Sequence, residues 1–566
     1  MADAAFKRIH DRFEKLSSGR GVWDDHWQRL GELMLPKRAD FTVKEAKGSR
    51  RQGGIVRYDG TPILAARNLA SALDGLLKPK TERWFAIKAE DPELNDLDEV
   101  KLWLEDTEDR MLAALYNRRA RFLQATGEVD LDLVVFGTGV LFTGISHTFD
   151  KLLFRSFHLK NTYIQRNNEG DVDAIYIRDM KTARQATQEF GGNVGDLVKE
   201  AMRKGKGEDE FEFVWAVAPR SDRDARRIDN RNFAWSSEWI DVKGEKRVNE
   251  SGFKRFPFQV PTWDNAADEI YGRSPGMVAL ADANTVNSQA KTILRAGEKV
   301  TDPPLLVAND SIMGRVKMFA GGINYFDADA ARRLGRIPLE ALKTGGQIPI
   351  GREMQNDTRE QIWQAFFRNI LQLPIDRPQM TATEVLERKE EFIRTIGPVF
   401  GRLESDYTGA IIDEVFAIMA ELGSFREAPD IIKGRDVRFE YTSPVQRARE
   451  QIQAAAAARS AEVLQPYVVA DPTVMDNFDG DQISRDVGVA SGMPSKWLVP
   501  VDVRDRKRHE RNQQIAEQQQ KEEALMAVDA GSKAAQSGLI EQVGDLGQST
   551  GPPLPGPPEG AATGGP

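Results

Sequence analysis

The chain has 566 residues, of which 40% are hydrophobic and 29% are charged, so about two to four structural units are expected rather than one core. It contains no cysteine, which excludes disulfides and cysteine-ligated zinc or iron–sulfur sites. Its net charge of −9 argues against an ordinary DNA-binding protein, which presents a basic surface to phosphates, although many soluble proteins are mildly acidic. The N-terminus is charged from the start, so no signal peptide is expected.

The N-terminal part of the chain predicts mainly helices. Residues 4–35 carry apolar residues at helical spacing, with an interruption near Gly19–Gly21, and Pro36 ends this run. Residues 40–57 are polar, basic and glycine-rich, which indicates an exposed loop. The elements expected next are a helix at 61–77, a strand around 83–89, a helix at 96–117 and a mostly helical, buried run at 121–145. The apolar stretch 133–145 is too short to cross a bilayer.

Between residues 152 and 262 the pattern changes to short strands. We expect strands at 153–158, 161–166, 173–178, 211–218 and 232–242, and helices at 181–190 and near 194–203. The charged segment 204–210 indicates a loop. The chain up to residue 269 is therefore predicted to be a mixed α+β unit.

A long helix is predicted at 275–301. Ser274 can cap it through its hydroxyl, Pro275 suits the first helical position, and Asp302-Pro303-Pro304 ends it. The preceding Gly272-x-Ser274-x-Gly276 also matches the nucleophile elbow of serine hydrolases. That function is excluded because the residue after the serine must supply an oxyanion-hole N–H, which Pro275 lacks.

The middle of the chain predicts two further helices around a compact segment. Residues 303–350 contain several turns, and a helix follows that ends before Pro374. Its apolar stripe consists of Ile362, Trp363, Phe366, Phe367 and Ile370, with Leu371 beyond them. After a short loop, Thr381-x-x-Glu384 forms a capping box that opens a helix to Leu422. Gly397 and Pro398 are expected to kink this helix, because proline removes a backbone hydrogen bond.

The C-terminal part predicts helices at about 444–464, 480–491 and 503–528. The last of these is polar all round, so it is not expected to pack against a core of its own. The final segment, 529–566, is rich in glycine and proline and is expected to be disordered.

Two segments far apart in the chain carry a family resemblance. Residues 58–88 contain an Asp-x-Thr turn, a helix of the pattern A-x-x-x-L-A-x-x-L-x-G-L, a proline and a Trp-Phe strand. The residues on this pattern are Asp59, Ala66, Leu69, Ala70, Leu73, Gly75, Leu76, Pro79, Trp84 and Phe85. The second landmark is the start Tyr271–Gly276 and the end Asp302–Leu305 of the long helix. Together they resemble the portal, or head-to-tail connector, proteins of short-tailed bacteriophages.

This resemblance implies a mainly helical α+β fold whose wing, stem, clip and crown regions assemble as a ring. The regions would be the wing at 1–269, the first stem helix at 270–302, the clip at 303–350, the second stem helix at 351–373, the channel loop at 374–380, a long kinked wing–crown helix at 381–423, a helical crown at 424–528 and a disordered tail at 529–566. The five apolar residues of the second stem helix would pack against the other stem helix and against neighbouring subunits.

The resemblance also implies a function without catalysis, cofactor or metal. The protein would form a dodecameric ring at one capsid vertex of the virion, after assembly in the host cytoplasm, and double-stranded DNA would be packaged and ejected through it. The implied partners are further copies of the chain, the major capsid protein, the scaffolding protein, the terminase large subunit, the tail adaptor or head-completion protein and DNA, but no membrane. An acidic protein suits a conduit, because a duplex gripped by many phosphate contacts would not slide freely.

Two sets of residues are candidates for contact with DNA or a partner. The first is the channel loop, which consists of Pro374, Ile375, Asp376, Arg377, Pro378, Gln379 and Met380. Its opposite charges at Asp376 and Arg377 suit loose, sequence-independent contact, and the alternative is a plain helix–helix turn buried between subunits. The second set, Lys291, Arg295 and Lys299, forms a basic stripe for DNA phosphates or an adaptor, and the alternative is a solvated helix face.

Two other functions remain as alternatives. One is a DNA-packaging enzyme, either a nuclease or an ATPase, and the other is a non-portal structural scaffold of the virion. The sequence holds no phosphate-binding loop of the G-x-x-x-x-G-K-[ST] type and no H-E-x-x-H, which argues against the enzyme. Helical periodicity by itself would also fit an ordinary multi-helix scaffold.

Overall fold

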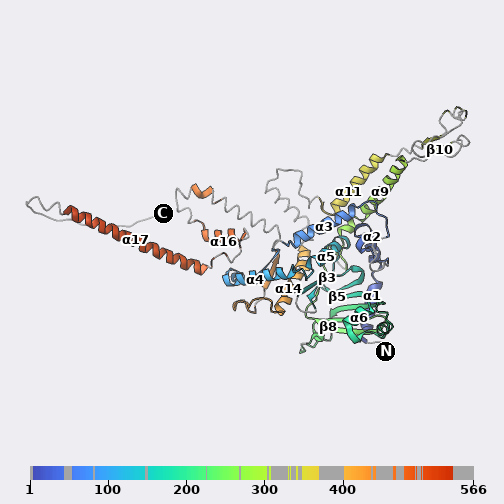
Figure 1. The fold of residues 1–566 in the computed structure, drawn as a ribbon, viewed down its shortest axis with the longest axis horizontal. Coiled ribbons are helices and arrows are strands. Elements are labelled where there is room, and N and C mark those ends of the chain that lie inside the picture. The colour runs from blue at the N-terminus through green and yellow to red at the C-terminus, as the bar shows by residue number, and fades with distance from the viewer. Residues whose placement is uncertain are drawn as a thin grey trace, which may run out of the picture. The chain divides into compact units, whose positions relative to one another are not determined.

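The computed structural model is drawn in Figure 1. It describes residues 4–43, 54–80, 83–146, 151–224, 226–227, 229–266, 269–301, 305–307, 339–341, 347–368, 401–434, 437–441, 463–466, 477–490 and 501–538, with a few isolated positions between them. The chain divides into two compact units, Met1–Met493 and Pro494–Pro566.

The first unit is α+β. Its helices are α1 (Ala4–Ser18), α2 (Gly21–Met34), α3 (Thr61–Leu77), α4 (Asp98–Leu115), α5 (Phe122–Phe136), α6 (Ala183–Phe190), α7 (Asp196–Arg203), α8 (Pro275–Val278), α9 (Leu280–Thr301), α11 (Ile348–Ala365), α14 (Ala410–Glu421) and α16 (Gly480–Ala490). Its strands are β1 (Phe85–Ala89), β2 (Leu141–Ile145), β3 (Leu152–Ser156), β4 (Thr162–Arg166), β5 (Val172–Thr182), β6 (Glu210–Pro219), β7 (Trp235–Asp241), β8 (Lys246–Phe253), β9 (Phe258–Gln259), β10 (Leu305–Val307), β11 (Leu339–Ala341) and β12 (Val437–Tyr441). In the second unit, α17 spans Val501–Gly538.

The largest sheet is antiparallel, with the strand order β4-β5-β6-β7-β8. Side chains alternate between its two faces, as the period of two in a strand requires. On one face Val214 packs with Phe13 of α1. On the other face Trp215 and Val217 belong to the main core of the unit. One face of the sheet therefore packs against α1, and the other face packs against the main core.

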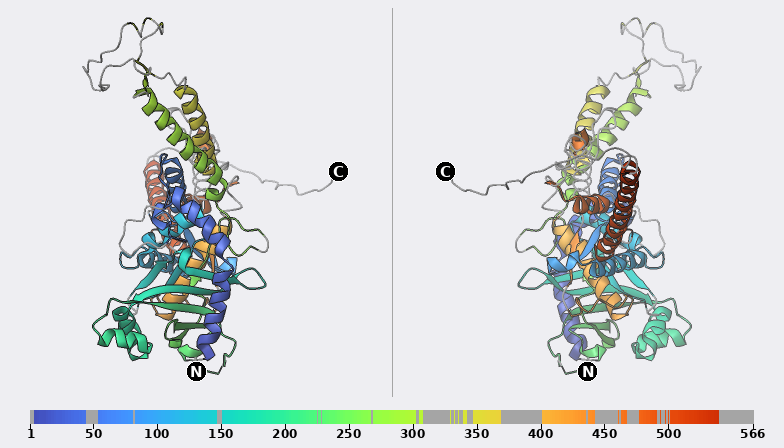
Figure 2. Two further views of the ribbon diagram at one scale, coloured as in Figure 1. Left: turned by 90° about the vertical axis from the view of Figure 1, so that its right-hand side faces the viewer. Right: turned by 90° about the vertical axis from the view of Figure 1, so that its left-hand side faces the viewer.

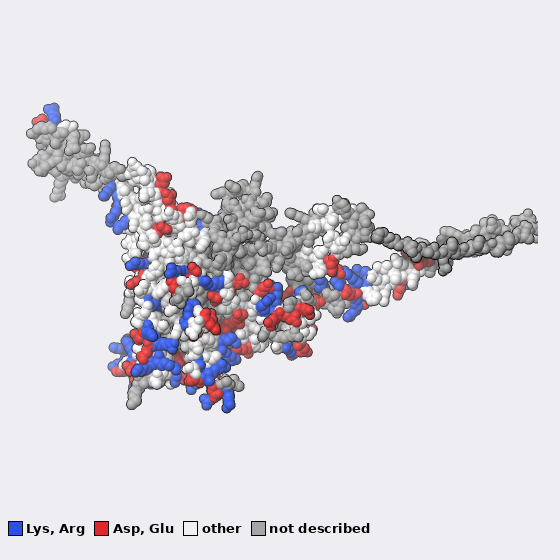
Figure 3. Space-filling view, turned by 180° about the vertical axis from the view of Figure 1, so that it is seen from behind, with Lys and Arg blue, Asp and Glu red and all other residues white. Residues whose placement is uncertain are grey.

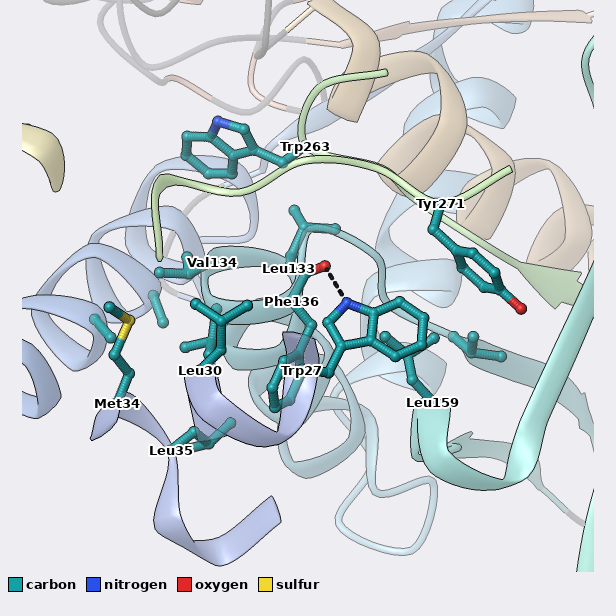
Figure 4. Packing of buried hydrophobic residues seen from close by; sticks show 14 of the residues in the cluster. Trp27, Leu30, Met34, Leu35, Leu133, Val134, Phe136, Leu159, Trp263 and Tyr271 are labelled. Carbon is teal, nitrogen blue, oxygen red and sulfur yellow. Dashed lines mark hydrogen bonds between the residues drawn. The ribbon is translucent and has the colours of Figure 1, made fainter. Parts of the chain in front are cut away.

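The main core lies where α2, α3, α5 and the first turns of the α8–α9 segment meet. Trp27 is fully buried there, and its ring meets the ring of Tyr271 edge to face, with 4.9 Å between centroids. Its indole Nε1 donates a hydrogen bond to the carbonyl oxygen of Phe136 at 3.2 Å (Figure 4). A buried tryptophan normally satisfies its N–H in this way. This contact ties α2 to the end of α5.

A second core is closed by a strand that returns from far along the chain. β1 pairs with β12 in an antiparallel ladder, with Phe85 opposite Tyr441. Helices α4 and α14 pack with this core, through buried side chains such as Val100 and Val415. The Trp-Phe strand identified in the sequence is therefore closed by residues more than three hundred positions away.

Helices α9 and α11 lie side by side and extend away from the sheets (Figures 1 and 2). We call α9 and α11 the helix pair. Ala283, Val286 and Ile362 at its base are buried in the main core. At its other end β10 pairs with β11, with Leu306 opposite Glu340.

The start of the helix pair is fixed by a backbone contact between two glycines. A Cβ on Gly272 would collide with the carbonyl oxygen of Gly137, and a Cβ on Gly137 would collide with that of Gly272. The amide of Gly272 donates to Thr138 Oγ1 at 2.9 Å. Ser274 Oγ donates to the carbonyl oxygen of Val135 at 2.7 Å and accepts from Met277 N at 3.0 Å. The Gly-x-Ser-x-Gly motif therefore serves packing and helix capping. This agrees with the exclusion of a nucleophile elbow, because Pro275 has no N–H for an oxyanion hole.

Most predicted elements are confirmed, including the helix at 61–77 and its following strand. The run 121–145 is wrong as a single helical element, because Gly137 adopts a left-handed φ of 81° and ends α5, after which β2 begins. Strands β8 and β9 were not predicted. The helix expected at about 353–373 spans Ile348–Ala365 in the structure, and Phe367 beyond it has a positive φ of 60°.

Toward the C-terminus the described helices differ from expectation in two further ways. The segment Glu404–Gly409, expected to be regular α-helix, is a π-helix that leads into α14. Helix α17 continues to Gly538, ten residues beyond its predicted end at 528 and into the segment expected to be disordered. The kink at Gly397 and Pro398 lies outside the described residues.

Replacement of Gly272 by alanine should destabilise the first unit by about 1–3 kcal/mol, because the new methyl group must displace backbone rather than a side-chain tip. Thermal unfolding of the purified protein measures this. Gly297→Ala in α9 is the matched control, because a Cβ at that position meets nothing within 4 Å. This variant should raise the free energy of unfolding by about 0.5–1 kcal/mol, since alanine favours a helix over glycine. Equal stability of the two variants would contradict the assigned role of the glycine contact.

Candidate functional site

A metal-binding cluster is absent from the residues that the structure describes, since among them no group of three or more His, Cys, Asp or Glu side chains could bind a metal ion. None of the helices in the described part of the chain is long and apolar enough to cross a membrane. Both landmarks of the sequence, the turn at Asp59 and the start at Tyr271–Gly276, adjoin the helix pair. We therefore treat the helix pair and its attachments as the candidate site.

Asp59 joins the turn before α3 to helix α11. Its Oδ1 accepts from Thr61 N at 2.8 Å, and its Oδ2 accepts from Gln355 Nε2 at 3.0 Å and Arg359 Nε at 2.9 Å. Burial alone would raise the pKa of Asp59, but the hydrogen bonds from Thr61 and Arg359, together with the charge of Arg359, lower it overall. The Asp-x-Thr turn therefore acts as a charged bridge to the helix pair.

Residues 56–59, which we call the strap, also contact α9. Tyr58 N donates to Asn287 Oδ1 at 2.7 Å, and Asn287 Nδ2 donates to the carbonyl oxygen of Val56 at 3.2 Å. The ammonium of Lys291 lies 5.9 Å from the centre of the Tyr58 ring. Because Asp59 contacts α11 and Tyr58 contacts α9, four consecutive residues hold both members of the helix pair.

A fully buried ion pair holds the π-helix against the body of the first unit. Lys78 Nζ lies 2.9 and 2.8 Å from the two carboxylate oxygens of Asp130, and 3.4 Å from the hydroxyl of Tyr407. The Tyr407 hydroxyl also donates to the carbonyl oxygen of Thr126 at 3.3 Å. Burial, and then the charge of Asp130, raise the pKa of Tyr407 well above its usual value. The segment that leads into α14 is thereby anchored to α3 and α5.

The predicted basic stripe lies on the outer side of the helix pair. Arg295 and Lys299 are exposed and Lys291 is half-buried, on the face of α9 opposite its buried residues. Figure 3 shows basic side chains along this edge and acidic side chains along the opposite edge of the helix pair.

The predicted packing residues of α11 lie at its C-terminal end, in the main core of the same chain. Ile362 and Phe366 are buried, and Trp363 and Phe367 are partly buried against the same core. The guanidinium of Arg368 lies 4.6 Å from the centre of the Trp363 ring. Ile370 and the channel loop, residues 374–380, lie outside the described residues.

Sequence reasoning missed the partners of Asp59 and the buried Lys78–Asp130 pair. A signal existed for Asp59, because it opens the Asp-x-Thr turn of the family pattern. Nothing in the sequence indicated Gln355 or Arg359 as its partners, which lie about three hundred positions away. A lysine before a proline likewise gives no sign that it is buried.

Comparison with known proteins places this arrangement in a family. The sequence profile of the family described as bacteriophage head to tail connecting protein matches residues 6–499. The chain therefore belongs to this family of phage portal proteins, which are structural connectors of the virion. It is 28% identical over 543 residues to the portal protein of Salmonella phage epsilon15, with 95% of both chains covered.

The chain is also similar to three further proteins. The probable portal protein of Bordetella phage BPP-1 is 27% identical over 503 residues, covering 87% of this chain and 89% of that protein. Among solved structures, a chain of the native gene transfer agent virion matches with a TM-score of 0.33 and 11% identity, over 78% of this chain and 95% of that chain. A chain from the neck of an empty gene transfer agent particle matches with a TM-score of 0.35 and 10% identity, over 74% and 94%.

Substitution of Asp59 by asparagine should weaken the attachment of α11 by about 1–3 kcal/mol at neutral pH, because a buried charged acceptor for Arg359 is lost. The pKa of Asp59 is lowered on folding, so its contribution is present above the unfolded pKa of about 3.9 and is lost as the pH falls through the folded pKa. The difference in unfolding temperature between wild type and variant should therefore shrink below pH ~4.

The control for this measurement is Asp11→Asn, because Asp11 is exposed on α1. Its unfolding temperature should follow that of the wild type at neutral pH. A difference between wild type and the Asp59 variant that stays constant down to pH ~3 would contradict the assigned ionic role of Asp59.

Substitution of Lys78 by methionine should destabilise the protein by about 3–5 kcal/mol, because Asp130 would remain buried without its cation. The double variant Lys78→Met/Asp130→Leu should recover much of this loss, since both charges are then gone. Lys80→Met is the control, because Lys80 is exposed two positions away. Thermal unfolding of the three variants tests this, and a double variant no more stable than the single one would contradict it.

Proposed function

We propose that the protein assembles as a closed dodecameric ring at one vertex of the capsid, and that double-stranded DNA enters and leaves the capsid through the channel of this ring. The observation that carries the proposal is the family match across residues 6–499. The similarity to two named or probable phage portal proteins over most of the chain supports the same function. The protein then acts by geometry and assembly, and not as an enzyme.

The regions of the chain take the following roles in this proposal. The sheets and helices of residues 1–269 form the wing, and the helix pair forms the stem. Residues 303–350, which join α9 to α11, form the clip that receives the terminase large subunit during packaging and the tail adaptor afterwards. The major capsid protein and the scaffolding protein meet the ring during assembly in the host cytoplasm.

The attachments of the helix pair support a mechanical role. Its base is buried in the main core, and the strap holds both helices at that base. A stem that must keep its place in a ring while DNA moves past it requires such fixation. Ligand-driven closure, by contrast, normally uses weakly held segments.

Electron microscopy of the purified protein tests the proposal directly. Rings with a central hole are the expected result. A stable monomer at micromolar concentration would contradict the proposed assembly, and intrinsic ATP hydrolysis abolished by a point substitution in this chain would favour a packaging enzyme. Mass measurement in solution gives the number of subunits independently.

Deletion of Asp376–Gln379 should leave ring assembly intact and impair packaging or retention of DNA. The reason is that we propose residues 374–380 as the loop that narrows the channel, with Pro374 and Pro378 restricting its backbone. Particle yield and DNA content after complementation of a portal-deficient phage measure the effect. Loss of rings on deletion would instead assign the loop to subunit packing.

A further inference from the structure

The helix pair carries basic residues on one outer edge. Lys291, Arg295 and Lys299 recur every four residues along α9, so their side chains share one face. At 100° per residue this face lies opposite the one that buries Val286 and Ala290. The basic edge, by which we mean Lys291, Arg295 and Lys299, therefore faces away from α11.

The same construction on α11 gives an acidic edge. Glu353, Asp357 and Glu360 are exposed, on the face opposite buried Thr358 and Ile362. We call these three residues the acidic edge. It faces away from α9, so that the two edges lie on opposite sides of the helix pair, as Figure 3 also shows.

Neither edge is neutralised within the described part of the chain. No ion pair there involves any of the six side chains, whereas nearby Arg359 is bound to Asp59. Exposed apolar side chains flank both edges: Leu294 is 54% exposed beside the basic edge, and Ile350 and Met354 are 51% and 56% exposed beside the acidic edge. Each edge thus combines three charged side chains that form no ion pair in the described residues with nearby exposed apolar surface.

We infer that the basic edge of one copy docks on the acidic edge of the next copy, head to tail around the ring. This inference rests on the proposed ring and assigns the residues that build its stem contacts. Because the two edges are different surfaces on opposite sides of one helix pair, each copy offers one edge to each neighbour. Such a heterologous contact forms a ring when its rotation closes.

The two edges lie at different positions along the axis of the helix pair, and this offset determines how the helix pairs are inclined in the ring. The antiparallel helices pass each other at Ile293 and Gly351, where Ile293 Cγ1 lies 3.3 Å from the position of a Cβ on Gly351. From that level the basic edge extends toward the end at Thr301, and the acidic edge toward the end at Ala365. At 1.5 Å per residue their centres differ by about 10 Å along the axis. Neighbouring helix pairs must therefore be inclined to the ring axis for the edges to meet.

A second copy fits these observations better than DNA or an adaptor protein. DNA phosphates would satisfy the basic edge alone and would leave the acidic edge and its apolar neighbours without a partner. A copy of the chain satisfies both edges with the same contact. The basic stripe considered above for DNA or an adaptor is therefore assigned to the interface between subunits.

Charge reversal on each edge tests the inference. Variant A carries Lys291→Glu, Arg295→Glu and Lys299→Glu, and variant B carries Glu353→Lys, Asp357→Lys and Glu360→Lys. Each variant alone should lose its rings in native mass spectrometry and electron microscopy, because like charges then face each other at every contact. An equimolar mixture of A and B should regain rings in which the two variants alternate, and a chain with all six changes should form rings alone.

Two controls keep the outcomes distinct. The triple variant Lys7→Glu, Lys15→Glu and Arg203→Glu changes the net charge as variant A does, at exposed positions of α1 and α7, and should assemble as the wild type does. Circular dichroism should show that A and B keep the wild-type fold, because five of the six replaced side chains are exposed and the sixth, Lys291, is half-buried beside the Tyr58 ring.

The results separate the failure of this inference from the failure of the proposed function. Rings formed by A and B at wild-type yield would overturn the edge contact while leaving the ring intact. The same result with loss of DNA retention or adaptor binding in variant A would assign the basic edge to that partner. A wild type that forms no rings would overturn the proposed function itself. Absence of rings in the A and B mixture, with both variants folded, would also overturn the edge pairing.

Discussion

The direct backbone contact between Gly137 and Gly272 is the constraint on which the placement of the helix pair depends. Each carbonyl oxygen occupies the space that a side chain on the other residue would need. Two hydrogen bonds lie beside this contact. The amide of Trp263 donates to the carbonyl oxygen of Gly137 at 3.0 Å, and the hydroxyl of Ser274 donates to a carbonyl oxygen in the last turn of α5. The end of α5 and the start of α8 are thus held together by direct backbone contact and by the hydroxyls of Thr138 and Ser274, which restricts the direction of α9.

The half of the helix pair nearer the core is buried, and the outer half is exposed. On α9 the buried residues, Ala283, Val286 and Ala290, all lie in the half nearer the core, and the half beyond Ala290 has none. The strap and Asp59 hold the pair near the same base. In the proposed ring, this exposed outer half is the part of the helix pair that a neighbouring subunit covers.

Local signals in the sequence predicted most of the fold, and the distant contacts explain what they missed. The cap at Ser274 and the prolines that follow Asp302 located the ends of the α8–α9 segment, because they act on adjacent residues, although the helix expected at 275–301 is interrupted at Ala279. The strand β2 was lost in an apolar run, since only residues 137–140, beginning with the left-handed Gly137, separate it from α5. The partner of β1, and the partners of Asp59 and Lys78, lie about fifty to more than three hundred positions away, where periodicity carries no information.

The arrangement of charge on the helix pair also disfavours two-fold dimers of the chain. A net charge of −9 says little about assembly, because it averages over surfaces of opposite sign. With a basic and an acidic edge on opposite sides, a two-fold dimer through either edge would bring like charges together, whereas the head-to-tail contact brings opposite charges together. Repulsion thus disfavours the closed dimers that would compete with a ring, and attraction favours the one contact that can be repeated around it. In the proposed ring, directional assembly follows from the placement of a few exposed residues on helices whose core-facing sides already fix their orientation.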